Sequence, residues 1–343
     1  KNAGSTMFNN TNRSNDSSAD KFEELKANFR KYQLIPLSII FCVGFLANSV
    51  VIFNGIRRRT VIKHYSNYFV LSMAFADFCV MIFSLPVVFI ENLMGFHKMN
   101  DYICAYVITI RETFQGAAIF SVSTLAILRV RQVLKNPHRQ FSKKICRRLV
   151  AAIWIISFLL CTTPFFDVYK INKEFGTCDP DYASPLRAKM HLTFITCILI
   201  SPMLIATISY GIVIVKVTNL LGPDPNSEIV AKRNRSIAML LILLILSCWT
   251  SYTPLGVYLL IDVYSKHDPD ILVWYIVTVL YFGGSALNPI LVLLTMPKDY
   301  YCNIECRRER RIGAEELNLE QKEILKSSIP LQDQNMSQDA LIN

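Results

Sequence analysis

The sequence predicts an all-α membrane protein, a bundle of seven transmembrane helices followed by a short amphipathic helix. Seven apolar segments occur, each long enough to cross a hydrocarbon core of about 30 Å. The 343 residues are 52% hydrophobic and only 18% charged, which is unusual for a soluble protein of this length. Lys and Arg also gather in alternate connections between the segments, the bias that orients membrane proteins.

The polar residues 1–32 precede the first apolar segment, and we expect them to form an irregular extracellular tail. Three Asn-x-Ser/Thr sequons lie in it, and their asparagines are Asn9, Asn12 and Asn15. Such sequons mark acceptor sites for N-glycosylation in a secreted or surface-exposed segment. The sequence therefore predicts a glycosylated tail.

The bundle is predicted over residues 33–296. The seven spans are placed at residues 34–56, 66–93, 103–128, 148–168, 191–215, 236–262 and 271–295. The Lys and Arg bias puts the N-terminus outside and the C-terminus in the cytoplasm, and the sequons agree. Five spans contain a proline, which frees a backbone carbonyl and kinks a helix: Pro86, Pro164, Pro202, Pro254 and Pro289.

The chain after the bundle divides into two parts. Residues 297–311 suit an amphipathic helix on the inner membrane face, and residues 312–343 are predicted to form a cytoplasmic tail. Cys302 and Cys306 flank basic residues there. They are candidate palmitoylation sites, with plain free thiols as the alternative.

The third span holds polar residues at a depth where lipid should exclude them: Arg111, Glu112 and Gln115. Such residues are costly and usually mark a pathway or a ligand site. Glu91, near the outer end of the second span, could pair with Arg111. Two readings stay open, a structural ion pair or a contact of Arg111 with a carboxylate, amide or phosphate of a ligand.

Three further spans each carry an isolated polar residue near mid-depth: Asn48, Asp77 and Asn288. Together they could form a hydrated network. The alternative is that they are structural hydrogen-bonding groups that hold helices together.

Nearly every span also contains a sequence marker, and the markers occur in a fixed order. They are Asn48-x-x-Val51, Asp77, Cys104 with Arg129, Trp154 with Pro164, Pro202 with Tyr210, Pro254, and Asn288-Pro289. With this set the chain resembles the rhodopsin-like (class A) G protein-coupled receptors over roughly residues 34–311.

The resemblance implies a multi-pass receptor of the plasma membrane. It would bind a diffusible extracellular ligand and transmit a conformational change to a heterotrimeric G protein, with arrestin as a further partner. The activation residues it implies are Asn48, Asp77, Arg129, Pro202, Tyr210, Pro254, Asn288 and Pro289. It also implies a disulfide between Cys104 and Cys178. The loop around Cys178, from Val168, suits a short hairpin.

Several family motifs are altered in this chain. Leu128-Arg129-Val130 replaces Asp-Arg-Tyr, and Asn234 replaces the acidic partner on the sixth span. This predicts raised basal signalling or altered coupling. Val292 and Tyr252 replace the tyrosine of Asn-Pro-x-x-Tyr and the tryptophan of the sixth span. The alternative function is therefore a non-signalling or G protein-independent relative, a decoy or scaffold.

The predicted pocket restricts the ligand class. Arg111 stands where amine receptors carry aspartate, which argues against a monoamine. Phe282 stands where opsins carry the retinal lysine. A peptide or another non-amine small molecule remains. The polar ligand contacts would be Glu91, Arg111, Glu112 and Gln115, and the walls would be Tyr252, Leu255, Leu259, Trp274, Thr278 and Phe282.

Other classes of function are disfavoured. No nucleophile–base pair or metal-ligand set indicates an enzyme or a resident metal, and no halves of the chain resemble each other as in many transporters. No cofactor or nucleic acid is expected. The resemblance raises a sodium ion at Asp77. However, Ala118 and Gly284 stand where many family members carry polar ligands, which argues against the ion.

Overall fold

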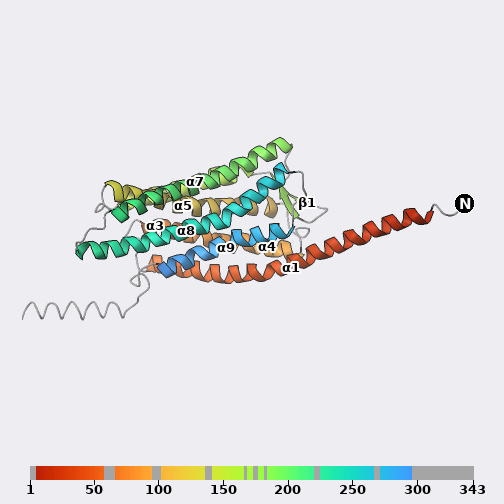
Figure 1. Cartoon of the computed structure of the whole chain (residues 1–343), viewed down its shortest axis with the longest axis horizontal. Coiled ribbons are helices and arrows are strands. Elements are labelled where there is room, and N and C mark those ends of the chain that lie inside the picture. The colour runs from red at the N-terminus through yellow and green to blue at the C-terminus, as the bar shows by residue number, and fades with distance from the viewer. Residues whose placement is uncertain are drawn as a thin grey trace, which may run out of the picture. The chain divides into compact units, whose positions relative to one another are not determined.

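The computed structural model contains the seven predicted spans. It describes residues 5–57, 66–94, 102–135, 141–165, 168–172, 177–180, 184–219, 225–265 and 271–295. Within these ranges, seven helices are long and apolar enough to cross a membrane, and they lie side by side in Figure 1. They are Lys31–Arg57, Ser66–Leu93, Ala105–Leu134, Lys143–Thr162, Pro185–Lys216, Ala238–Tyr264 and Leu272–Thr295.

Several spans are built from more than one helical segment. The first span lies in α1 (Ser5–Arg57), and the second joins α3 (Ser66–Cys79), η1 (Val80–Ser84) and α4 (Leu85–Met94). The third joins η3 (Ile103–Val107) and α5 (Ile108–Lys135). The fourth comprises α6 (Lys143–Ser157) and η4 (Phe158–Thr162), followed by the short η5 (Thr163–Phe165). The last three lie in α7 (Pro185–Asn219), α8 (Pro225–Tyr264) and α9 (Ile271–Thr295).

The helices extend further than the apolar segments. The α1 helix begins at Ser5, so the expectation of an irregular tail is wrong from that residue on. Residues 18–32 contain three Lys and two Glu, which favour helix without being apolar. Residues 5–17 are mostly Asn, Ser and Thr, and their composition does not explain the helix there. Similarly, α8 begins at Pro225, within polar sequence. Apolar patterning locates the part of a helix that meets lipid. It does not locate the helix ends, because a helix can continue into polar sequence.

Two of the π-helical turns are explained by proline. The turn η1 ends two residues before Pro86, and η4 ends two residues before Pro164. A proline has no N–H for the carbonyl four residues earlier, and its ring clashes with that carbonyl. In η1 the N–H of Leu85 bonds the carbonyl of Val80 instead, a wider turn that removes the clash.

Polar caps fix the starts of two helices. The Ser142 hydroxyl accepts a hydrogen bond from the Ile145 N–H, 3.4 Å away, and so caps α6. The Ser184 hydroxyl accepts from the Arg187 N–H at 3.2 Å, and Pro185 occupies the first position of α7, where its missing N–H costs nothing. The fourth and fifth spans therefore begin before the predicted residues 148 and 191.

The predicted hairpin is present between the fourth and fifth spans. The strands β1 (Tyr169–Asn172) and β2 (Thr177–Pro180) pair antiparallel, with Ile171 opposite Cys178. β1 also packs against η3, at the start of the third span. The hairpin therefore lies at the end of the bundle that holds Cys104.

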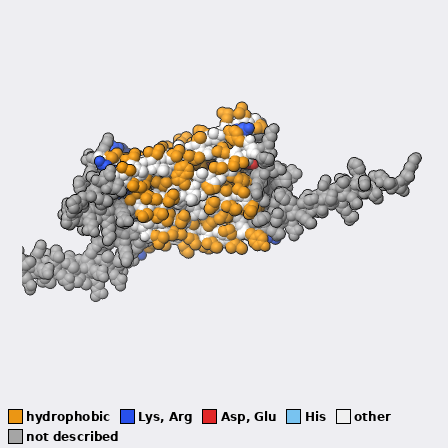
Figure 2. Space-filling view, in the orientation of Figure 1, with side chains coloured by type: hydrophobic (Ala, Val, Ile, Leu, Met, Phe, Trp, Pro, Cys, Tyr) orange, Lys and Arg blue, Asp and Glu red, His pale blue; other side chains and the backbone are white. Residues whose placement is uncertain are grey.

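Burial in the bundle is inverted relative to a soluble protein. Large apolar side chains such as Ile39, Ile155 and Leu294 are 60–77% exposed, whereas Asn48, Asp77 and Gln115 are 0% exposed. Figure 2 shows a face dominated by hydrophobic and uncharged side chains, with charged ones near its ends. Lipid covers such an apolar surface, and polar groups are stable only inside the bundle.

Candidate ligand-binding site and inner polar network

An ion pair occupies α5 near its N-terminal end. The Arg111 Nε and Nη2 atoms donate to Glu112 Oε1 over 3.0 and 2.9 Å. The two side chains are 21% and 12% exposed, so water screens the pair only partly. The structure thus gives Arg111 the neighbour on its own helix as a partner. The sequence raised Glu91 of the second span as the partner of Arg111, whereas the structure pairs Arg111 with Glu112. This pair does not exclude a ligand contact.

Aromatic residues surround the guanidinium of Arg111. Its Cζ atom lies 5.7 Å from the ring centroid of Tyr281 in α9, a favourable cation–π distance. Tyr169 of the hairpin lies within electrostatic reach of Arg111. The ion pair is therefore enclosed by α9 and by β1. Sequence reasoning missed both tyrosines, although the hydroxyl of Tyr281 within a span is itself an unusual polar group.

Below the ion pair, Gln115 links α5 to α8. The hydroxyl of Tyr252 donates to Gln115 Oε1, and both residues are buried. The Tyr252 ring packs edge-on against Tyr281, with centroids 5.6 Å apart, and Tyr281 contacts Phe282 in the same way at 5.3 Å. Four predicted ligand residues, Arg111, Gln115, Tyr252 and Phe282, are thus connected, with Tyr281 in the centre.

A cavity of about 20 Å³ lies beside Arg111. Glu91 and Ser84 contribute polar groups to its lining, and Val87, Val88 and Val107 contribute apolar ones. The Ser84 hydroxyl is buried and has no hydrogen-bond partner among the described residues. Glu91 and Arg111 both line this cavity. It is large enough for one water molecule, and a ligand must widen it.

Four further residues were predicted as walls of the pocket: Leu255, Leu259, Trp274 and Thr278. Trp274 is 40% exposed, and its ring packs against Tyr258 at 5.5 Å. The hydroxyl of Thr278 donates to the carbonyl of Trp274 at 2.8 Å. Leu255 packs against the core, and Leu259 is half-buried.

Cys178 is disulfide-bonded, and it lies in β2 of the hairpin. Six other cysteines whose side chains are described are free. The side chain of Cys104 lies outside the described residues, so the pairing of Cys104 with Cys178 stays a prediction. The packing of β1 against η3 brings the two backbone segments near each other.

The three isolated polar residues take part in buried contacts at mid-depth. Asn288 donates through Nδ2 to Asp77 Oδ2 at 3.0 Å, and its Oδ1 accepts from the Ser247 hydroxyl at 2.9 Å. Asn48 donates to the carbonyls of Gly44 and Ser285 at 2.9 and 3.0 Å. These hydrogen bonds tie α3, α8 and α9 at one point and α1 to α9 at another.

The residues around Asp77 do not match the sodium-binding set that the family resemblance implies. Asp77 Oδ1 has no hydrogen-bond partner among the described residues, so it can accept one more bond. Ala118 and Gly284 offer no side-chain oxygen. In addition, a Cβ atom at position 284 would lie 2.8 Å from the Cβ of Ser251, so no polar side chain fits there.

Toward the other end of α5, Arg129 Nη1 donates to Gln132 Oε1 at 3.2 Å. Leu128 beside it is buried in the core, and so is Tyr210 of α7. Between Arg129 and the ion pair along α5, the Ser123 hydroxyl donates to the Pro202 carbonyl at 2.6 Å. This hydrogen bond fixes α5 to α7. Pro254 and Pro289 lie inside α8 and α9 as predicted.

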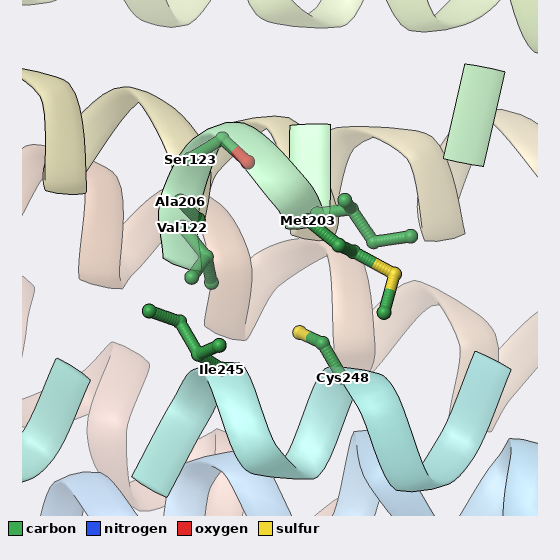
Figure 3. A pocket seen from close by; sticks show the side chains of 7 residues that line it. Val122, Ser123, Met203, Ala206, Ile245 and Cys248 are labelled. Carbon is green, nitrogen blue, oxygen red and sulfur yellow. The ribbon is translucent and has the colours of Figure 1, made fainter. Parts of the chain in front are cut away.

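A second cavity, of about 10 Å³, lies between α5, α7 and α8. Figure 3 shows the side chains that surround it, with the small Cys248 thiol on one side and Met203 on the other. The lining residues are Ile119, Val122, Ser123, Met203, Ala206, Ile245 and Cys248. This is a packing gap, too small for a ligand.

Some predicted features fall outside the described residues. These are the side chains of Asn9, Asn12, Asn15 and Asn234, the segments 297–311 and 312–343, and Cys302 and Cys306. Glycosylation, palmitoylation and the amphipathic helix stay predictions.

Comparison with known families decides the class of protein. A family profile described as "7 transmembrane receptor (rhodopsin family)" matches residues 47–291. The chain belongs to the rhodopsin family of seven-transmembrane receptors. It is a receptor and not an enzyme, as the sequence predicted, and a multi-pass membrane protein.

Several curated receptors are similar to this rhodopsin-family receptor. Somatostatin receptor type 5 of Rattus norvegicus is 24% identical over 75% of this chain and 73% of the relative. The pyroglutamylated RF-amide peptide receptor of Mus musculus is 22% identical over 78% and 68%. The QRFP-like peptide receptor of Branchiostoma floridae is 22% identical over 84% and 81%.

Proposed function

We propose that this rhodopsin-family receptor binds an extracellular peptide and activates a heterotrimeric G protein. The observation that carries the proposal is the buried polar cluster of Arg111, Glu112 and Gln115 beneath the hairpin. The names of the relatives support a peptide ligand, since they include somatostatin and RF-amide peptide receptors. The Lys and Arg bias and the sequons support a plasma-membrane orientation with the N-terminus outside and the C-terminus in the cytoplasm.

The charges of the site restrict the ligand further. Among the described residues of the site, Glu91 and Glu112 carry negative charges and Arg111 carries a positive one. In the described part of the chain Arg111 donates only through Nε and Nη2, which leaves Nη1 for a ligand carbonyl. A peptide offers backbone carbonyls to Arg111 and N–H groups to Glu91, and neither interaction requires a charged ligand group.

The function is tested by screening peptides on cells that express the receptor, with G protein activation and arrestin recruitment recorded in parallel. A peptide that produces a saturable G protein response supports the proposal. Peptide binding without a response in either assay would instead establish the non-signalling relative that the altered motifs suggest.

The site is tested with the double variant Arg111→Gln/Glu112→Gln, which removes the ion pair without leaving one charge buried and unpaired. We expect the potency of an active peptide to fall by about tenfold to a hundredfold, or roughly 1.4–2.8 kcal/mol of binding energy. Cell-surface receptor is quantified in parallel through an N-terminal epitope. The control is Asp262→Asn, an exposed carboxyl in α8, which should leave potency unchanged. Unchanged potency in the double variant would make the ion pair purely structural.

We also propose raised basal activity. The residue before Arg129 is the buried, apolar Leu128 rather than a carboxylate. In the family, a carboxylate at that position holds the arginine in the inactive state. Leu128→Asp would supply a charge next to the guanidinium, where an ion pair of low exposure is stronger than at a free surface. We expect ligand-free second-messenger output to fall several-fold at equal surface expression. Equal basal output of the two forms would contradict this part of the proposal.

A further inference from the structure

The first two turns of α6 carry four basic residues and no acidic one: Lys143, Lys144, Arg147 and Arg148. All four are exposed. They belong to a longer basic stretch, since residues 113–166 contain no Asp or Glu. Among the described residues, no carboxylate forms an ion pair with any of these four cations.

The four cations share one side of the helix. At about 100° per residue, their positions fall within an arc of roughly 140°. The buried residues of α6, Cys146, Ile153 and Ser157, lie on the other side and pack into the bundle. The cations thus point outward from the receptor.

The same side of the fourth span continues as a lipid-facing surface. Ala151, Ile155 and Phe158 follow the cations at the same helical phase. Ile155 is 60% and Phe158 is 42% exposed, and Ala151 is exposed as well. One strip of surface therefore presents cations where the span begins and apolar side chains further into the membrane.

The arrangement is electrostatically unfavourable unless an anion is present. The N-terminus of a helix is already positive, and cations in its first turn are repelled. Lys143 and Arg147, like Lys144 and Arg148, are four residues apart, so their like charges repel each other as well. Phosphate groups between the four side chains would remove both penalties.

We propose that this strip, made of Lys143, Lys144, Arg147, Arg148, Ala151, Ile155 and Phe158, binds a phosphoinositide of the membrane. The headgroup phosphates lie among the four cations, and an acyl chain lies along the apolar side chains. Clusters of four or more Lys and Arg at a membrane surface suit such multivalent headgroups. A soluble acidic partner would use the cations but not the lipid-facing continuation. Only the assignment to the inner leaflet rests on the orientation given under Proposed function.

The test uses the full-length receptor in phosphatidylcholine nanodiscs titrated with a phosphoinositide, with bound lipid counted by native mass spectrometry. Each cation near a membrane surface contributes about fivefold in affinity, so Lys144→Gln/Arg148→Gln should weaken binding about 25-fold. The matched control is Arg187→Gln/Lys189→Gln, which removes two charges from the start of α7 and should change the affinity less than about twofold. Melting temperatures of both variants verify the fold.

Three results would overturn the proposal. The first is equal phosphoinositide affinity in the two double variants. The second is competition by soluble inositol trisphosphate as strong as that by the lipid, which would make this a site for free phosphates. The third is normal lipid binding with a loss of G protein activation, which would assign the strip to the transducer. The titration needs no peptide, so it stays informative if the proposed ligand class is wrong.

Discussion

Replacing Asn288 with alanine is expected to destabilise the receptor by about 2–4 kcal/mol, because two buried groups would each lose their partner. Asp77 Oδ2 would lose its 3.0 Å bond and the Ser247 hydroxyl its 2.9 Å bond. The purified receptor in detergent should melt at a lower temperature. A ligand-stimulated signal should also decrease, since the same residue joins α3, α8 and α9.

The matched variant is Asp77→Asn. An amide oxygen at position 77 can accept the same hydrogen bond from Asn288, and the substitution removes a charge from a fully buried position. Little or no loss of stability is therefore expected. Replacing sodium by choline at constant ionic strength should leave the melting temperature unchanged, because positions 118 and 284 offer no side-chain ligands. An Asp77→Asn variant as unstable as Asn288→Ala, or a clear sodium dependence, would refute this account of the network.

Gly284→Ala is expected to cost about 1–3 kcal/mol, the range for overpacking a close contact. A Cβ atom there would lie 2.8 Å from the Cβ of Ser251, closer than two carbons can approach, and Ser251 is buried in α8. The size swap Gly284→Ala/Ser251→Gly would restore the space. It should recover the stability to within about 1 kcal/mol, the cost of a glycine inside a helix.

Thermal melting of the purified variants measures this effect. Gly211→Ala is the control, since a Cβ at position 211 meets no atom within 4 Å. It should be neutral or slightly stabilising, by about 0.5 kcal/mol. A Gly284→Ala variant as stable as the Gly211→Ala control, or a size swap without recovery, would show that α8 and α9 can separate freely at this point. Because the polar contact of Ser247 with Asn288 is one turn away, the signalling response should follow the stability.

Local sequence pattern predicts the spans and the hairpin of this receptor well, and the helix ends less well. Seven long apolar segments can exist only as membrane helices, because backbone groups in lipid must bond within their own segment. The hairpin was predicted from β-branched and aromatic residues between Val168 and Cys178, and it is present. The helix ends were less predictable, since the start of α6 depends on the Ser142 cap and that of α7 on Ser184 and Pro185.

Sequence pattern did not predict which aromatic residues belong to the candidate site. Arg111, Glu112 and Gln115 were identified because polar groups in a span are rare. Tyr281 and Trp274 could not be ranked in this way, since an aromatic residue fits both lipid and protein interior. The structure buries Tyr281 against Arg111 and leaves Trp274 40% exposed. In a uniformly apolar span there is little contrast between faces, so helix rotation is set by contacts with the neighbouring helices.

The sequence by itself determined the class of this receptor, the number of its spans and the polar residues inside them, because hydropathy and rare intramembrane polar groups are local properties. Only the tertiary structure decided which of those groups meet. It paired Arg111 with Glu112, placed Tyr252 on Gln115 and put Ser251 into the space beside Gly284. It also aligned the basic start of α6 with a lipid-facing strip. Apart from the ion pair within α5, these contacts join different helices, and the burial of one side of α6 depends on its neighbours, so packing geometry selects them.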